Sequence, residues 1–245
     1  MSLNKNPRSQ IGRNIVASYS HVDKQLSEKM LLANDYSSYN LWNFGFIYSE
    51  NGIIKDKYLF GNLQLMEDYQ KLSAESYYRW EYAKDKKLSL RFFGGVFINN
   101  HTRNNTFDLG ISRVSNYAFS YNLLAQSASS GIFAQQFIIA EGGFKSYING
   151  TANQFVFATN VDAHAWKMFN IYADFGAYKN KYSSSKFIWD SGVKLKVIPD
   201  FLEIYFPVQS TLGFEPGFKD YKNRIRYTLN LNLNSVIGYF RRGWF

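Results

Sequence analysis

The sequence predicts an all-β fold, an antiparallel β-barrel of about twelve strands that spans a membrane, which is a usual strand number for such barrels. Three observations support this: an excess of aromatic residues, segments of about ten residues in which apolar and polar side chains alternate, and a regular succession of short and long connections. The 245 residues are enough for one such domain. A barrel of about ten or fourteen strands and a soluble β-sandwich are the alternatives.

The aromatic content exceeds what a soluble core needs. The chain contains 22 Phe, 19 Tyr and 5 Trp, or 19% of its residues. A bilayer accommodates such an excess, because Tyr and Trp favour the membrane interface and Phe favours the hydrocarbon. No apolar run is long enough for a membrane-spanning helix. A closed barrel is then the remaining way to cross a bilayer, because it pairs every backbone polar group inside the protein.

Alternation of apolar and polar residues is clearest near the C-terminus. Segment 224–234 places Ile225, Tyr227, Leu229, Leu231 and Leu233 on one face and Arg224, Arg226, Thr228 and three asparagines on the other. We expect the first face to meet lipid and the second to line the lumen. Further strands are predicted at Arg13–Val22, Ser38–Tyr48, Lys57–Tyr69, Lys71–Ala83, Leu88–Asn99, Gln154–Trp166, Phe169–Phe175, Lys186–Ile198 and Phe201–Val208.

Residues 105–147 are harder to interpret. Tyr117–Leu124 and Phe133–Ala140 resemble strands, and the whole stretch could hold two strands or four. The connections on either side of it follow the barrel rule of short turns on one side and long loops on the other. The short ones are Lys84–Lys87, Trp166–Phe169 and Ile198–Phe201, and the long ones are His101–Thr106, Lys179–Ser185 and Gln209–Asn223.

The predicted domain organisation is simple. Residues 1–12 form a polar linker, residues 13–234 the barrel, and residues 235–245 a basic and aromatic tail that either extends the final strand or forms an interfacial helix. Trp244 and Phe245 are candidates for the signal that outer-membrane assembly machinery reads. Because the beginning of the chain has no apolar leader segment, we expect it to follow something upstream.

Composition and motifs exclude several functions. The net charge of +9 is spread along the chain rather than gathered in a stripe, which is typical of a solvated surface rather than of nucleic-acid binding. Cysteine is absent, and the three histidines, His21, His101 and His164, lack zinc-ligand spacing. No His-Glu-x-x-His, Gly-x-Ser-x-Gly or phosphate-loop motif is present. We therefore expect no catalytic site and no cofactor.

A row of acidic residues is the one group of side chains that could form a functional site. A tight turn at Trp166–Phe169 would set Asp162 opposite Asp174, and the next hairpin would set Asp174 opposite Asp190. Three adjacent carboxylates could hold a divalent cation, but we favour a structural charge network. The other polar side chains expected to face the lumen are His164, Lys194, Lys196, Glu203, Arg224 and Arg226.

Several segments resemble a known family. They are residues 131–137 and 141–145, residues 194–207, and the ending at 239–245. Together they resemble the C-terminal region that follows the peptidase domain in bacterial zinc metalloproteases of the aminopeptidase N-like family, over most of residues 85–245. The resemblance implies a membrane-embedded domain without the zinc ligands or the catalytic glutamate, because these lie in the peptidase domain.

The expected function is therefore that of a non-catalytic outer-membrane domain that anchors or assembles an exported zinc peptidase. Its partners would be outer-membrane lipid, the outer-membrane assembly machinery and an upstream peptidase domain. One alternative is a free-standing channel or porin, whose lumen charges would set its ion preference. The other is a barrel hydrolase that uses Asp162 and His164.

Overall fold

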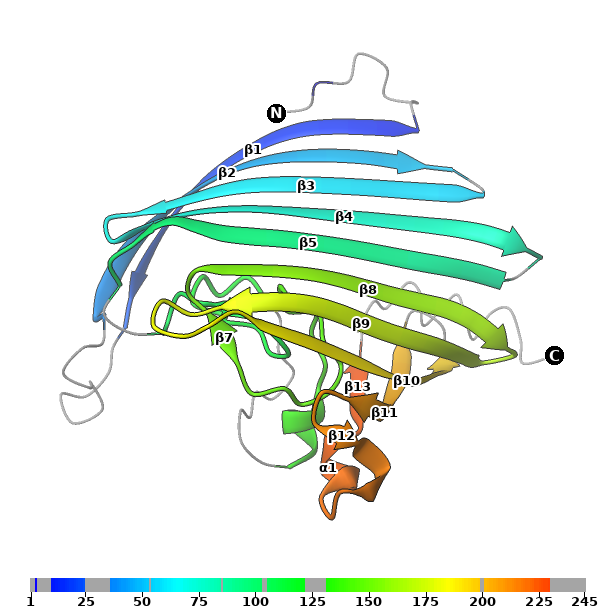
Figure 1. The fold of residues 1–245 in the computed structure, drawn as a ribbon. Helices are drawn as coiled ribbons and strands as arrows, with labels where there is room; N and C mark the ends of the chain where they lie inside the picture. Colours follow the sequence, from blue (N-terminus) through cyan, green and yellow to red (C-terminus); the bar gives the residue numbers. More distant parts are fainter. Residues whose placement is uncertain are drawn as a thin grey trace.

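One long antiparallel sheet curves around a segment of irregular structure. The structure is a computed structural model, and it describes residues 3, 10–24, 36–52, 54–84, 86–102, 105–121, 131–198 and 201–229. Eleven strands share the sheet, in the order β1-β2-β3-β4-β5-β8-β9-β10-β11-β12, with β13 paired to β11. Figure 1 shows how these strands bend around the chain that joins β5 to β8.

Most strands are long enough to cross the hydrocarbon layer of a bilayer at the tilt that is usual in membrane barrels. They are β1 (Ile11–Asp23), β2 (Ser38–Asn51), β3 (Lys55–Met66), β4 (Tyr69–Ala83), β5 (Lys86–Asn100), β8 (Phe155–Trp166), β9 (Phe169–Lys179), β10 (Lys186–Ile198) and β11 (Leu202–Ser210). The short elements are β6 (Leu109–Gly110), β7 (Thr151–Ala152), β12 (Gly213–Phe214), β13 (Arg226–Leu229), the helix α1 (Tyr221–Arg224) and two 3₁₀ turns at Ile132–Gln135 and Glu215–Gly217.

The predicted alternation of polar and apolar side chains along the strands is confirmed. In contrast to a water-soluble protein, the apolar side chains are the exposed ones and the polar side chains are buried. On β9, Asn170, Tyr172 and Asp174 are buried on the concave face, whereas Phe169 and Ile171 are exposed on the convex face. The other strands repeat this arrangement. Exposed apolar side chains on the convex face include Trp42, Phe44, Phe46, Leu59, Leu72, Phe92, Val96, Phe157, Phe175 and Phe187.

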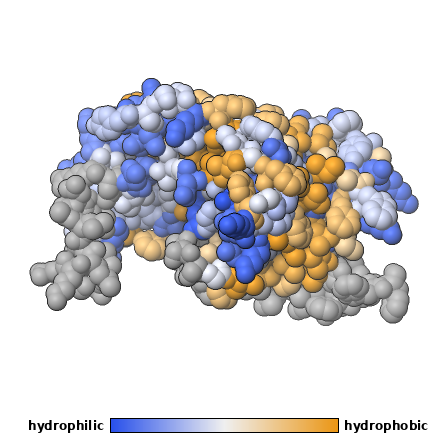
Figure 2. All heavy atoms as spheres, turned by 60° about the horizontal axis from the view of Figure 1, so that its bottom comes forward, coloured by the Kyte–Doolittle hydropathy of each residue, from blue (hydrophilic) through white to orange (hydrophobic). Residues whose placement is uncertain are grey.

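The space-filling view agrees with this distribution. Figure 2 shows hydrophilic residues gathered toward the two ends of the molecule and a broad band of apolar residues between them, interrupted by a hydrophilic patch. An apolar band flanked by polar ends is the pattern expected of a barrel in a bilayer.

The inner segment, which we define as residues 105–121 and 131–152, fills the concave side. It contains only the two-stranded pair β6–β7 and one 3₁₀ turn, so the strands predicted at Tyr117–Leu124 and Phe133–Ala140 are wrong within its described residues. Phe107, Leu109, Ile111 and Phe144 are fully buried and belong to the apolar core that the segment shares with the sheet. Within the two predicted strands, Tyr117 and Phe137 are buried whereas Phe119, Phe133 and Ile139 are exposed, so burial does not follow the two-residue period of a strand.

Other boundaries also differ from the prediction. The turn between β3 and β4 lies at Glu67–Asp68 rather than between the predicted strand ends at Tyr69 and Lys71, because Tyr69 belongs to the buried face of β4. Ile11 and Gly12, assigned to the linker, already pair in β1. The rest of the linker, apart from Leu3 and Gln10, and the tail with Trp244 and Phe245 lie outside the described residues.

The predicted all-β antiparallel fold is confirmed, whereas a closed barrel is not present in the described part of the chain. No described strand pairs with the outer edge of β1, and β13 pairs with β11 and through Tyr227 with Gln136. Among the described residues, the structure contains no helix with the length and apolarity needed to cross a membrane.

Candidate functional site: the polar interior

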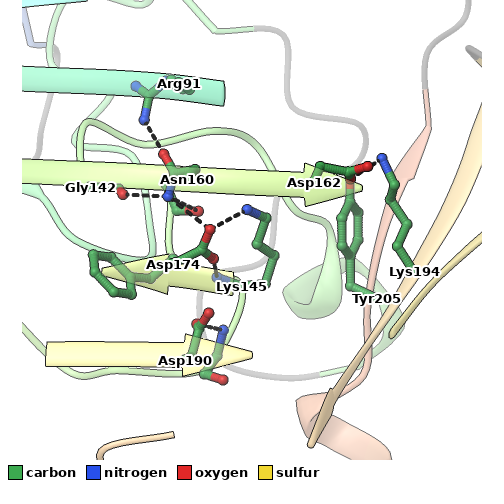
Figure 3. Close-up of polar contacts among 12 residues, drawn as sticks. Arg91, Gly142, Lys145, Asn160, Asp162, Asp174, Asp190, Lys194 and Tyr205 are labelled. Carbon is green, nitrogen blue, oxygen red and sulfur yellow. Dashed lines mark hydrogen bonds and ion pairs between the residues drawn. The ribbon is translucent and has the colours of Figure 1, made fainter. Parts of the chain in front are cut away.

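Five polar side chains meet at the centre of the concave face. This central cluster consists of Arg91 on β5, Asn160 on β8, Asp174 on β9, Asp190 on β10 and Lys145 of the inner segment, and Figure 3 shows how they converge. Asp174 and Asp190 are direct partners in the β9–β10 ladder, as predicted, and both are fully buried.

The inner segment contacts both of these acidic side chains. The Lys145 Nζ lies 2.6 Å from Asp174 Oδ1, and the Asn160 amide donates to the same oxygen at 2.9 Å. The backbone N–H of Ser146 donates to Asp190 Oδ2 at 2.6 Å. Two buried acids on neighbouring strands thus bind two successive residues of the inner segment.

Arg91 attaches the same segment from the other side. Its Nε donates to Glu75 at 2.5 Å and its Nη1 to Asn160 Oδ1 at 2.8 Å, while further N–H groups reach the carbonyls of residues 140 and 141. Gly143 adopts a φ of 68°, and a Cβ there would lie 2.6 Å from Asn160 Oδ1. Only glycine fits this close, left-handed turn.

A second group, the end cluster, lies near the short-turn end of the sheet. Lys194 on β10 forms ion pairs with Asp162 on β8 and, at 3.5 Å, with Glu203 on β11. The Tyr205 hydroxyl donates to Glu203 at 2.9 Å. One lysine bound between two carboxylates forms an ion-pair group, and this supports a structural role for the cluster.

The predicted row of three carboxylates is wrong in one member. Asp162 pairs with Tyr172, and Asn160 is the residue opposite Asp174. A two-residue turn and a bulge between His164 and Trp166 together place the β8 register two positions away from the predicted one. The described residues contain no group of three His, Cys, Asp or Glu side chains that could hold a metal.

The other residues predicted to face the lumen have different outcomes. Lys194, Lys196 and Glu203 line an interior cavity, and Arg226 is 2% exposed. Arg226 donates to the carbonyls of Ser112 (2.7 Å) and Phe144 (3.3 Å), so it is a further attachment of the inner segment.

Arg224 instead belongs to α1, where it pairs with Glu215 and Asp220. His164 belongs to neither cluster.

Sequence reasoning missed Arg91, Lys145 and Asn160. Arg91 and Asn160 occupy polar positions of predicted strands, so the alternation alone could have placed them on the inner face. Lys145 had no such signal, because its segment shows no periodicity and its position depends on contacts distant in sequence.

Asp108, in the inner segment, is a buried acid of a different kind. One of its oxygens accepts a hydrogen bond from Thr151 at 2.8 Å, and the other has no partner among the described residues. Burial raises the pKa of Asp108, and this outweighs the opposing effects of the Thr151 hydrogen bond and the Lys71 charge.

This raised pKa predicts a pH dependence of stability. The folded chain holds the Asp108 proton more tightly than the unfolded chain, so stability is lost as pH rises from the ordinary aspartate range through the raised pKa. We expect Asp108→Asn to remove that loss and to raise the melting temperature more at pH 8 than at pH 5. Melting curves of wild type and variant that run parallel between these pH values would contradict the prediction.

The fold and its polar interior define a class of protein: an all-β chain whose single curved sheet is apolar outside and holds a charged network and an ordered inner segment inside. Among the described side chains the network joins acids to bases and amides, an arrangement suited to holding the inner segment in place. Comparison with known protein families, curated proteins and solved structures finds no match for this chain.

Proposed function

We propose that this chain is an outer-membrane β-barrel domain without catalytic activity of its own. The observation that carries the proposal is the reversed polarity of the sheet, with large apolar side chains exposed on the convex face and charged side chains buried on the concave face. In water such a surface would aggregate, because exposed apolar patches of this extent are rare on soluble monomers. In a bilayer the same surface is satisfied by lipid.

The proposal includes closure of the sheet by its two edges. In hydrogen-bonded order β13 is the tenth strand counted from β1, through β11, and all neighbours are antiparallel. Pairing of the β1 edge with a strand continuing from β13 would therefore be antiparallel, and the barrel would have an even strand number, as bacterial outer-membrane barrels do. In lipid, closure provides hydrogen-bond partners for backbone groups at the two edges of the sheet, because no water is present there to do so.

The biological role we propose is the anchoring of an exported zinc peptidase. It is supported by the resemblance of residues 131–145 and 194–207 to the region that follows such peptidase domains. The ordered inner segment also favours an anchor over an open porin, because Arg91, Lys145 and Arg226 attach it to the wall at several points. A peptidase coding sequence upstream, in the same reading frame, is the outcome expected; its absence would contradict this role.

The membrane proposal is tested by folding the chain with and without lipid. We expect folding only in detergent or lipid, and a folded form that migrates faster on gels before heating than after it, as closed barrels commonly do. Circular dichroism and gel migration, measured on the same samples, are the readouts. A monomeric protein that unfolds cooperatively without detergent would overturn the proposal.

A further inference from the structure

A cavity of about 400 Å³ lies between the inner segment and the concave face, toward the short-turn end of the sheet. Strands β4, β5, β8, β9, β10 and β11 contribute to its wall, and the inner segment forms the other side through Phe137, Ile139, Gly143 and Lys145. Its volume is within the range of sites for small molecules.

Basic side chains outnumber acidic ones in the described lining of this cavity. Among the described residues that line it, the carboxylates are those of Asp162 and Glu203, and Lys194 binds both. Three further acids pair with cations of the lining but lie outside it. Asp56 pairs with Arg79, Glu75 with Arg91 and Asp174 with Lys145. Six basic side chains face the cavity: Arg79, Lys87, Arg91, Lys145, Lys194 and Lys196. The five acids that contact these cations offset most of this charge, and the remaining excess of positive charge favours an anion in the cavity.

An unsatisfied acceptor lies in the same wall. Asn170 is 2% exposed, and its amide nitrogen donates to Asp162, but its carbonyl oxygen has no hydrogen-bond partner among the described residues. Because buried oxygens are normally hydrogen-bonded, this one can accept from a donor such as the hydroxyl of a ligand. Tyr77, Phe137 and Tyr205 add aromatic surface against which the less polar face of a small molecule can pack.

From this combination we propose that the cavity binds a small anion that also carries hydroxyl groups, the chemistry of a sugar phosphate or of a hydroxylated phospholipid headgroup. The cationic side chains would hold the anionic group, and the Asn170 carbonyl oxygen would accept from a hydroxyl. This site is additional to the anchoring role and does not depend on an attached peptidase.

Calorimetric titration of the full folded chain tests the proposal with three probes: glucose 6-phosphate, inorganic phosphate and glucose. We expect glucose 6-phosphate to bind more tightly than phosphate, and glucose not to bind. Lys196→Gln should weaken glucose 6-phosphate about tenfold, the usual effect of losing one charge-assisted hydrogen bond. Lys186→Gln is the matched control, because Lys186 is an exposed lysine at the opposite end of the same strand, β10.

Two further variants keep the test decisive. Lys87→Gln changes an exposed lysine of the lining, so it should leave folding intact and still weaken binding. Asn170→Leu should reduce glucose 6-phosphate binding toward that of phosphate while leaving phosphate affinity unchanged. Binding that is equal in the cavity variants and in Lys186→Gln would overturn the proposal.

Lipid titration distinguishes the two sources of the anion. Phosphatidylglycerol carries a phosphate and free hydroxyls, whereas phosphatidylcholine has no hydroxyl. A rise in melting temperature with phosphatidylglycerol micelles that is absent with phosphatidylcholine and lost in Lys196→Gln would identify a headgroup. Binding of glucose 6-phosphate without that rise would identify a soluble ligand. Neither response, in a chain that is folded by circular dichroism, would refute the site.

Discussion

Replacing Lys145 with Met is expected to lower the free energy of unfolding by about 3–5 kcal/mol, the usual cost of leaving buried charge without its partner. Lys145 is the cation that contacts Asp174, and Asp190 lies directly beside that acid on the next strand. Both carboxylates are fully buried, so water cannot replace the lysine. The variant should also loosen residues 140–146, which the central cluster attaches to the sheet.

Lys57→Met is the control for this prediction. Lys57 is half exposed and pairs with Glu50 at 3.6 Å, so its loss should cost at most about 1 kcal/mol. The double variant Lys145→Met, Asp174→Asn should recover part of the lost stability, because it removes the carboxylate that Lys145 contacts. Chemical denaturation in detergent measures all three. A cost for Lys145→Met no larger than that for Lys57→Met would show that the cluster is not the attachment we describe.

The second large effect is expected on the convex face. Phe175 lies near the middle of β9 and is 43% exposed. If this face meets lipid, Phe175→Arg should destabilise the protein by about 2–4 kcal/mol, the cost of an arginine near the bilayer midplane. On a water-exposed surface the same substitution would change stability by no more than about 0.5 kcal/mol. Unfolding by urea from lipid vesicles is the measurement.

Tyr182→Arg provides the comparison. Tyr182 lies in the turn between β9 and β10 and is 91% exposed, well away from the apolar band. The same new residue at this position should be nearly neutral in lipid. Equal effects of the two substitutions would mean that the convex face does not contact hydrocarbon.

The strands and their faces could be predicted from the sequence because both depend on neighbouring residues. Alternation with a period of two assigns each side chain of a strand to one face or the other without knowledge of the rest of the chain. It identified β9 and β10 and placed Asp174, Asp190 and Lys194 on the inner face, where the structure has them. The adjacency of Asp174 and Asp190 followed from counting across one hairpin.

The partner of Asp162 and the path of the inner segment were decided only by the tertiary structure. The tight turn and the bulge beside His164 together place Asp162 opposite Tyr172 rather than Asp174, while every side chain keeps its face, and alternation cannot detect such a shift. Lys145 reaches Asp174 across 29 residues, from a segment with no periodicity of its own. Its position depends on contacts that form only when the sheet has curved around it, so nothing local in the sequence specifies it.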